Sequence, residues 1–442
     1  MALYGSVGRH SRASGNGAVT ALFILVALLV LLLGGVPIAF ALGGLGLTLL
    51  LLADLSPLMV PQGLYSSMDS FVLVAVPLFL LMSNILLKGG VGRDLFNAVQ
   101  SWVGHWPGGL AVATIISCGI FSAISGSSVT TAATIGTVAI PEMSRRGYDR
   151  RFVLGLVAAG GTLGILIPPS IPMIIYGVVV EESIVDLFLA GIGPGALLAL
   201  MFILFSIAFS YFGKGFKPVP RASTAERLRT SIRALPTLVL ATCILGGLYL
   251  GVFTPTEAAG VGFALALLLT VGLLRSLSWV QLKEAVIESM QTTVTIFLIL
   301  AGAKIFGKAI TLYRIPQDIS LAITSNISEA GMFVLIVCLV LLVMGFFLEA
   351  LSMLLIMVPV LHPSLVGMGI DPIWFGIMFV IMIECALVTP PVGLNLFVIQ
   401  AVAKTPIEDV IAGVWPFTLM MLGSIAIIYV LPDVALYIPF KL

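Results

Sequence analysis

The fold of this chain is decided by the stretch Gly160-Gly-Thr-Leu-Gly-Ile-Leu-Ile-Pro-Pro-Ser170, which lies inside an apolar segment long enough to cross a membrane. Two consecutive prolines remove two backbone hydrogen-bond donors and disfavour helix in the residue before them. A helix must therefore break inside the span, which leaves carbonyl groups without helical partners. Such backbone is tolerated at membrane depth only where it is packed in protein or lines a wet cavity.

The same pattern returns 222 residues later as Glu384-Cys-Ala-Leu-Val-Thr-Pro-Pro-Val-Gly-Leu-Asn395. Further matches at this offset pair Ser67-Met68 with Ser289-Met290, Gly109 with Gly331, Pro141 with Pro363, and Gly147-Tyr-Asp149 with Gly369-Ile-Asp371. Proline pairs and a Gly-x-Asp motif at one constant offset are not expected from composition alone. We therefore interpret the chain as an internal duplication.

The composition indicates a polytopic membrane protein. Of the 442 residues 60% are hydrophobic and only 9% are charged, whereas an average soluble domain carries roughly 25% charged residues. This excludes a soluble enzyme, a secreted disulfide scaffold, a disordered protein and a nucleic-acid binder. The four cysteines and three histidines form no ligand cluster, and the chain has no Walker-type phosphate loop, so we expect no enzyme.

Apolar segments of about 20 residues predict the membrane crossings. The predicted spans are 18–34, 36–54, 69–88, 151–179, 186–213, 235–251, 255–274, 290–311, 372–403 and 407–432. Two longer stretches, 108–142 and 330–362, are interrupted midway by small, polar or acidic residues, and each predicts a re-entrant helical hairpin. Residues 91–106 and 313–328 are less apolar, and we expect them to form interfacial arms.

Basic residues predict the orientation. The clusters at 144–151 and 214–234 belong in the cytoplasm by the positive-inside rule, which puts both termini outside. Five crossings in each half would insert the second half upside down, so the predicted fold is an all-α polytopic membrane protein of two inverted-topology repeats. The predicted parts are a tail (1–17), repeat 1 (18–213; hairpin 108–142, broken helix 151–179), a basic cytoplasmic linker (214–234) and repeat 2 (235–442; hairpin 330–362, broken helix 372–403).

Each half pairs a polar hairpin tip with a polar helix break. Free carbonyls and nearby hydroxyls suit a desolvated Na⁺, and the N-termini of half-helices suit a carboxylate. The alternative for these segments is a kink with small-residue packing. Glu349, in the second tip, could bind a cation, relay a proton or cap a helix. Glu257 is interpreted as a structural acid in the first turn of a helix. No role is predicted for Glu384.

Several of these motifs resemble one known family over residues 20–435, the large membrane subunit of tripartite ATP-independent periplasmic (TRAP) transporters. The matching stretches are Ser125-Gly-Ser-Ser128, Pro141-Glu-Met143, Arg146-Gly-Tyr148, Gly164-Ile-Leu-Ile-Pro-Pro-Ser170, Phe253-Thr-Pro-Thr-Glu257-Ala-Ala259 and Arg314-Ile-Pro-Gln317. The resemblance implies a Na⁺-driven, elevator-type importer of an organic acid, such as a C4-dicarboxylate, sialic acid or a keto acid, in a bacterial inner membrane. Its partners would be a small four-helix membrane subunit and a periplasmic substrate-binding protein. The moving part would be 108–179 with 330–403.

The resemblance also implies two Na⁺ sites, one at each pairing of tip and break. The residues expected to coordinate Na⁺ are Ser125, Ser128, Gly161, Gly164, Pro168, Gly345, Thr389, Pro390 and Gly393. The residues expected to contact the substrate are Ser125, Gly126, Ser127, Ser170, Glu349, Ser352 and Asn395. Because the first 18 residues leave no room for four helices, we expect the small subunit to be a separate chain. The alternative is a self-sufficient Na⁺/dicarboxylate symporter of a related inverted-repeat fold.

Overall fold

The structure is a computed structural model that describes residues 17–53, 61, 64–65, 69–212, 220–326, 329–390 and 393–441. Over these ranges the chain is helical and contains no strand, which confirms the predicted all-α class. The helices are α1 (Gly17–Leu33), α2 (Ile38–Leu52), α4 (Ala75–Lys88), α5 (Val91–Val103), α6 (Gly109–Ser125), α7 (Ser128–Arg145), α8 (Arg150–Leu166), α9 (Ile171–Val180), α10 (Ile184–Phe212), α11 (Thr224–Tyr249), α12 (Pro255–Leu267), α13 (Trp279–Leu312), α14 (Ile315–Asn326), α15 (Ala330–Met344), α16 (Ala350–Gly367), α17 (Pro372–Val388), α18 (Leu394–Ala403), α19 (Ile407–Val430) and α20 (Asp433–Lys441). The predicted tail apart from Gly17, the pair Ser67-Met68, and Pro391 lie outside the described residues.

Seven helical segments are long and apolar enough to cross a membrane, or eight if the pair α8–α9, bent by 41°, counts as one span. They are 71–88, 184–212, 224–249, 255–273, 279–312, 350–367 and 407–430. The first includes a 3₁₀ turn, η2 (Phe71–Val74), and the fourth ends in a π-helical turn, η3 (Leu268–Leu273). The predicted spans 18–34 and 36–54 are shorter apolar helices, α1 and α2. The prediction of a multi-pass membrane protein is confirmed at this level.

The chain divides into two compact units. Unit 1 contains 1–70, 294–334 and 355–372, and unit 2 contains 71–293, 335–354 and 373–442. In unit 1, α2 crosses α13 through glycines: a Cβ on Gly46 would lie 2.7 Å from the backbone nitrogen of Phe306, and Gly302 meets the carbonyl of Ala39. Tyr313 then donates its hydroxyl to the carbonyl oxygen of Leu49 at 3.1 Å. Small residues allow this close helix approach.

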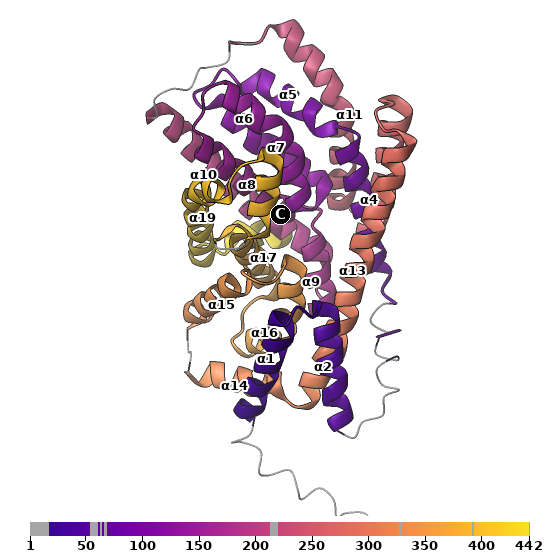
Figure 1. Cartoon of the computed structure of the whole chain (residues 1–442), viewed down its shortest axis with the longest axis vertical. Helices are drawn as coiled ribbons and strands as arrows, with labels where there is room; N and C mark the ends of the chain where they lie inside the picture. Colours follow the sequence, from indigo (N-terminus) through magenta and orange to yellow (C-terminus); the bar gives the residue numbers. More distant parts are fainter. Residues whose placement is uncertain are drawn as a thin grey trace, which may run out of the picture. The chain divides into compact units, whose positions relative to one another are not determined.

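Unit 2 is organised around α8, which packs against α6, α7, α10 and α19 (Figure 1). Its residues from Phe152 to Leu166 are all buried, as are those of α17 from Ile373 to Val388. A helix that is apolar on every face belongs in the interior of a bundle. Both helices that precede the predicted breaks are therefore enclosed by protein within this unit, which is the condition for non-helical backbone at membrane depth.

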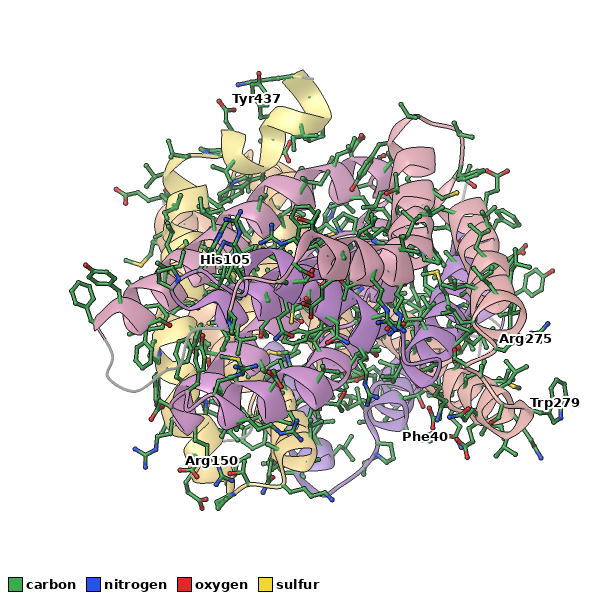
Figure 2. The ribbon with its side chains drawn as sticks, turned by 90° about the horizontal axis from the view of Figure 1, so that it is seen from above. Phe40, His105, Arg150, Arg275, Trp279 and Tyr437 are labelled. Atoms are coloured by element: carbon green, nitrogen blue, oxygen red, sulfur yellow. The ribbon has the colours of Figure 1, made fainter. Side chains whose placement is uncertain are left out.

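Two helices begin earlier than their apolar spans predict. Helix α11 starts at Thr224, capped by the Ser223 hydroxyl, so the second half of the segment predicted as a linker is helical. Helix α13 starts at Trp279 rather than near 290. Polar and charged turns continue these helices beyond the apolar region, which hydropathy alone cannot detect. Trp279 and Tyr437 point away from the helices of unit 2 (Figure 2) and are 80% and 51% exposed, as expected for aromatic anchors at a membrane interface.

The helix boundaries follow the 222-residue offset found in the sequence. Helices α7 and α16 start and end at equivalent positions, and so do α8 and α17. The compact units do not follow the part of the chain predicted to move, because residues 330–334 and 355–372 of its second segment, 330–403, belong to unit 1. The inverted relation of the two halves stays a prediction.

Candidate functional site

The first hairpin tip is a short polar turn between α6 and α7. Helix α6 ends at Ser125, Gly126 adopts a left-handed conformation (φ 61°), and Ser127 caps α7 by accepting the backbone N–H of Thr130 at 3.4 Å. The hydroxyls of Ser125 and Thr131 lie 2.7 Å apart. The tip therefore gathers three hydroxyl groups around one turn, and Ser125 is fully buried.

The tip packs directly against the first break. A Cβ on Gly164 of α8 would lie 2.5 Å from the carbonyl oxygen of Ser127, and a Cβ on Gly126 would lie 2.7 Å from that of Pro169. Real Cβ atoms essentially never come that close to a backbone atom. Glycine at both positions thus lets the two segments meet backbone to backbone, with the Ser127 carbonyl oxygen against Gly164 and the Pro169 carbonyl oxygen against Gly126.

The first break itself lies between α8 and α9. Helix α8 ends at Leu166, the Pro168–Pro169 peptide bond is cis, and α9 begins at Ile171. Ser170 caps α9 by accepting the backbone N–H of Met173 at 3.4 Å. The N-termini of α7 and α9, each capped by a serine, are thus brought to the same tip-and-break contact, and helix N-termini favour anions.

The second hairpin tip differs in chemistry. Helix α15 ends at Met344 and α16 begins at Ala350, so Glu349 directly precedes α16. The Ser352 hydroxyl donates to the Glu349 carboxylate at 3.3 Å. This geometry suits a capping acid at a helix N-terminus. A Cβ on Gly345 would lie 2.5 Å from the Cβ of Ala386, so this tip contacts the end of α17.

The second break follows Val388, where α17 ends. Thr389 donates its hydroxyl to the Cys385 carbonyl oxygen at 2.5 Å. Beyond Pro391 and Val392, which lie outside the described residues, Gly393 has a positive φ of 35° and α18 begins. The Nδ2 of Asn395 lies 3.5 Å from Oε2 of Glu384, and both side chains are buried.

The residues predicted to bind Na⁺ or substrate all belong to unit 2, where the structure brings the two halves into contact. Helix α18 packs against α7 and α8, and the Ser128 hydroxyl of α7 lies near the Glu384 carboxylate of α17. Sequence reasoning assigned no role to Glu384 and did not select Thr131. Thr131 could have been found by spacing, since it lies one helical turn beyond the Ser127 cap.

Two further features lie away from this site. Glu257 completes a capping box with Thr254, accepting the Thr254 backbone N–H at 2.8 Å, as a structural acid should.

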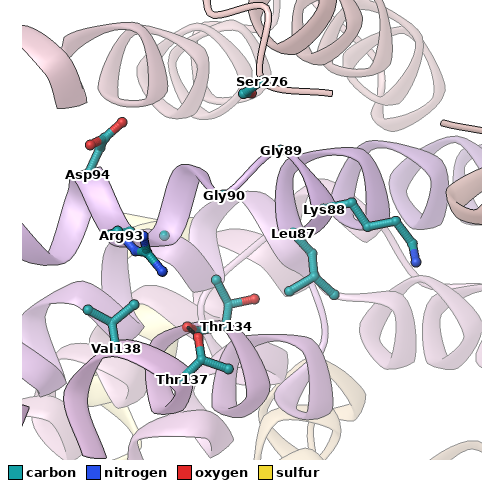
Figure 3. A pocket seen from close by; sticks show the side chains of 11 residues that line it. Leu87, Lys88, Gly89, Gly90, Arg93, Asp94, Thr134, Thr137, Val138 and Ser276 are labelled. Atoms are coloured by element: carbon teal, nitrogen blue, oxygen red, sulfur yellow. Dashed lines mark hydrogen bonds between the residues drawn. The ribbon is translucent and has the colours of Figure 1, made fainter. Parts of the chain in front are cut away.

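A cavity of about 470 Å³ lies between the α4–α5 turn, α7 and Ser276 (Figure 3). Lys88 and Arg93 line it, but it contains none of the predicted site residues.

The ligands available at the tips and breaks are mostly neutral oxygens. Within the described ranges no group of three or more His, Cys, Asp or Glu side chains could hold a metal ion. Hydroxyl and carbonyl oxygens are hard ligands of low charge, which suit an alkali cation better than zinc or another transition metal.

Comparisons with known proteins point to one family. The model of the family described as "Tripartite ATP-independent periplasmic transporter, DctM component" matches residues 25–434. The C4-dicarboxylate TRAP transporter large permease protein DctM of Pseudomonas aeruginosa is 39% identical over 395 residues, which cover 89% of this chain and 92% of that protein. The isethionate TRAP transporter permease protein DctMQ of Oleidesulfovibrio alaskensis is 36% identical over 405 residues, or 91% of this chain and 64% of that longer protein.

One solved structure resembles the whole fold. The crystal structure of the YdaH transporter of Alcanivorax borkumensis has a TM-score of 0.57 and 15% identity, covering 95% of this chain and 98% of that one. At this identity the likeness concerns the fold alone. The family match and the relatives, by contrast, extend over nearly the full sequence, including both tips and both breaks. The chain therefore belongs to the DctM family, the large permease subunits of tripartite ATP-independent periplasmic transporters.

Proposed function

We propose that this large permease subunit imports a small organic anion together with Na⁺ across a bacterial inner membrane. The observation that carries the proposal is the glycine-mediated contact between the first tip and the first break. There the Ser127 carbonyl faces Gly164 and the Pro169 carbonyl faces Gly126. Carbonyl and hydroxyl oxygens that line such a buried backbone contact are ligands that can replace the hydration shell of Na⁺.

Two Na⁺ positions follow from the two tip-and-break pairs. In the first, Na⁺ is held by Ser125, Ser128, Gly161, Gly164 and Pro168, through hydroxyl and carbonyl oxygens. In the second it is held by Gly345, Thr389, Pro390 and Gly393. Binding of these ions orders the tips and completes the substrate site between them.

The substrate class follows from the helix N-termini at the same place. The starts of α7 and α9 carry partial positive charge, and Ser127, Ser170 and Ser352 offer hydroxyls beside them. Asn395 and Glu349 complete the proposed contacts. The names of the two relatives specify a C4-dicarboxylate and isethionate. Both compounds are small anions, so we propose that this chain transports a carboxylate or a related organic anion.

Transport follows an elevator mechanism in which 108–179 and 330–403 move together across the membrane. Each positive charge that moves inward through 100 mV releases about 2.3 kcal/mol, so two Na⁺ with a singly charged anion, a net charge of +1, support roughly 1.5–2 decades of accumulation from the potential alone. The chain works with a small membrane subunit, which the name DctMQ indicates is joined to the large one in the isethionate relative. A periplasmic binding protein delivers the substrate, and both termini face the periplasm.

The test is uptake of radiolabelled organic acids by proteoliposomes. Vesicles would contain this chain alone, this chain with the small subunit, or both with the binding protein, and each would be assayed with a Na⁺ or a choline gradient. Uptake that needs Na⁺ and all three proteins supports the proposal. Na⁺-driven uptake by the single chain would instead establish the self-sufficient symporter.

A further inference from the structure

Glu384 presents an electrostatic problem that the two proposed Na⁺ positions leave unsolved. Its side chain is 1% exposed on a helix that is buried from Ile373 to Val388. Among the described residues its polar neighbours are neutral: the Asn395 amide donates to it at 3.5 Å, and the Ser128 hydroxyl lies near it. No salt bridge reaches it in that part of the chain. A buried carboxylate without an opposite charge is costly.

Two oxygen atoms of this pair also have no partner. Oε1 of Glu384 and Oδ1 of Asn395 are buried, and neither has a hydrogen bond within the described residues. Oε1 belongs to the carboxylate whose Oε2 accepts the Asn395 N–H, and Oδ1 belongs to the amide whose Nδ2 donates it. The two unpartnered oxygens are therefore part of one local cluster. Both are acceptors, which only a donor or a cation can satisfy. Buried polar atoms are nearly always paired, so two unpaired acceptors in contacting groups point to a ligand.

We propose that Glu384 and Asn395 bind a third Na⁺, with Oε1, Oδ1 and the Ser128 hydroxyl oxygen as protein ligands. One carboxylate neutralises one monovalent ion, whereas protein sites for Ca²⁺ commonly use several carboxylates. The inference rests on the proposed function in taking the ion to be Na⁺. It differs from the first Na⁺ position in its charged ligand, and it shares Ser128 with that position.

The location gives this ion a role in joining the two halves. Ser128 begins α7 of the first hairpin, whereas Glu384 and Asn395 flank the second break. A cation between them links one tip-and-break pair to the other, so occupation of the two proposed Na⁺ positions becomes coupled. In its absence, Oε1 of Glu384 and Oδ1 of Asn395 have no partner among the described residues.

The experiment measures equilibrium binding of radioactive Na⁺ to the purified full-length chain, with choline as the replacement cation. Wild type is compared with Glu384→Gln, which keeps the side-chain volume but removes the charge, and with Asn395→Ala, which removes the amide oxygen. Glu257→Gln is the matched control, because Glu257 is exposed and glutamine also serves in a capping box. Size-exclusion chromatography and thermal unfolding verify that each variant is folded.

We expect Glu384→Gln to bind one Na⁺ fewer per chain than wild type, with Glu257→Gln unchanged. Asn395→Ala should lower the affinity for one Na⁺ at least tenfold, because the loss of one contact to a charged group raises a dissociation constant by about that factor or more. If either Glu384→Gln or Asn395→Ala folds and binds Na⁺ with wild-type number and affinity, the third position is wrong, and Glu384 is neutralised in another way, such as by a proton.

A further variant separates this inference from the proposed function. Among the three Na⁺ positions, Ser125→Ala alters only the first. Loss of Na⁺ affinity in Ser125→Ala with wild-type binding in Glu384→Gln would overturn the third position and leave Na⁺ coupling standing. A wild-type chain that binds no Na⁺ would overturn both.

Discussion

The two tip-and-break pairs occupy equivalent positions at the 222-residue offset, yet they present opposite chemistry. Ser127 and Glu349 are equivalent, and each directly precedes the second helix of its hairpin. Thr162 and Glu384 are equivalent on α8 and α17. The first half therefore uses hydroxyls where the second half uses carboxylates. The shared backbone arrangement determines where ion-coordinating side chains can lie, whereas the side chains themselves determine how much charge each half contributes.

The packing of the two pairs differs in the same way. In the first pair glycines bring backbone against backbone, as at Gly164 and Ser127. In the second pair Gly345 meets the Ala386 side chain, and the buried Glu384 carboxylate lies near Ser128 of the first half. We infer that the first pair offers an ion only neutral oxygens, whereas the second pair adds the fixed charge of Glu384 to the neutral oxygens at its break.

The largest effect is expected from Gly164→Ala. The added Cβ would lie 2.5 Å from a backbone oxygen that cannot rotate away, so tip and break must separate. Overpacking of this kind costs roughly 1–3 kcal/mol in stability, and we expect Na⁺-driven uptake in proteoliposomes to fall at least tenfold. Gly246→Ala is the control, since no atom lies within 4 Å of its added Cβ. Equal uptake in the two variants would remove the packing argument for the first pair.

Loss of a hydroxyl should have the next largest effect, and it compares the two halves directly. Ser128→Ala should raise the Na⁺ concentration for half-maximal uptake by about tenfold, because a contact with a charged group is worth roughly 1.5–3 kcal/mol. Thr389→Val should act in the same direction in the second half. The controls are Ser424→Ala and Thr418→Val, whose hydroxyls are also buried and bond to carbonyls within their own helix. Unchanged Na⁺ dependence in both site variants would contradict the site assignment.

A smaller effect should distinguish capping from ion binding at the equivalent positions Ser127 and Glu349. Ser127→Ala removes a helix cap and should lower the free energy of unfolding by about 1 kcal/mol. Glu349→Gln should cost about 0.3–1 kcal/mol if the acid serves mainly the α16 N-terminus. Thermal unfolding in Na⁺ and in choline measures both. A Glu349→Gln variant that loses stabilisation by Na⁺ would show that Glu349 is an ion ligand and would make the two tips less alike.

The sequence predicted those parts of the fold that depend on local chemistry. The double prolines marked the ends of α8 and α17, and interruptions in long apolar stretches marked both tips, because a missing donor or a polar turn acts within a few residues. Long-range contacts could not be predicted in this way. Glu384 lies in an apolar run without a charged neighbour in sequence, and only the fold brings Ser128, more than two hundred residues earlier, near it. The starts of α11 and α13 were missed because polar turns extend both helices beyond the apolar segment.

The smallest effect is expected at Thr162, and it is the most direct test of the difference between the halves. Thr162 occupies the position equivalent to Glu384, but its hydroxyl already donates to the Ala159 carbonyl oxygen at 2.6 Å. Since that carbonyl is itself part of a helix, Thr162→Val should cost no more than about 1 kcal/mol in stability and leave Na⁺ binding unchanged. Binding of radioactive Na⁺ to Thr162→Val and Glu384→Gln, side by side, measures the contrast. If Na⁺ binding falls to the same extent in both variants, Thr162 is also an ion ligand. The two halves then bind ions through equivalent side chains, and the contrast between neutral oxygens in the first half and fixed charge in the second is wrong.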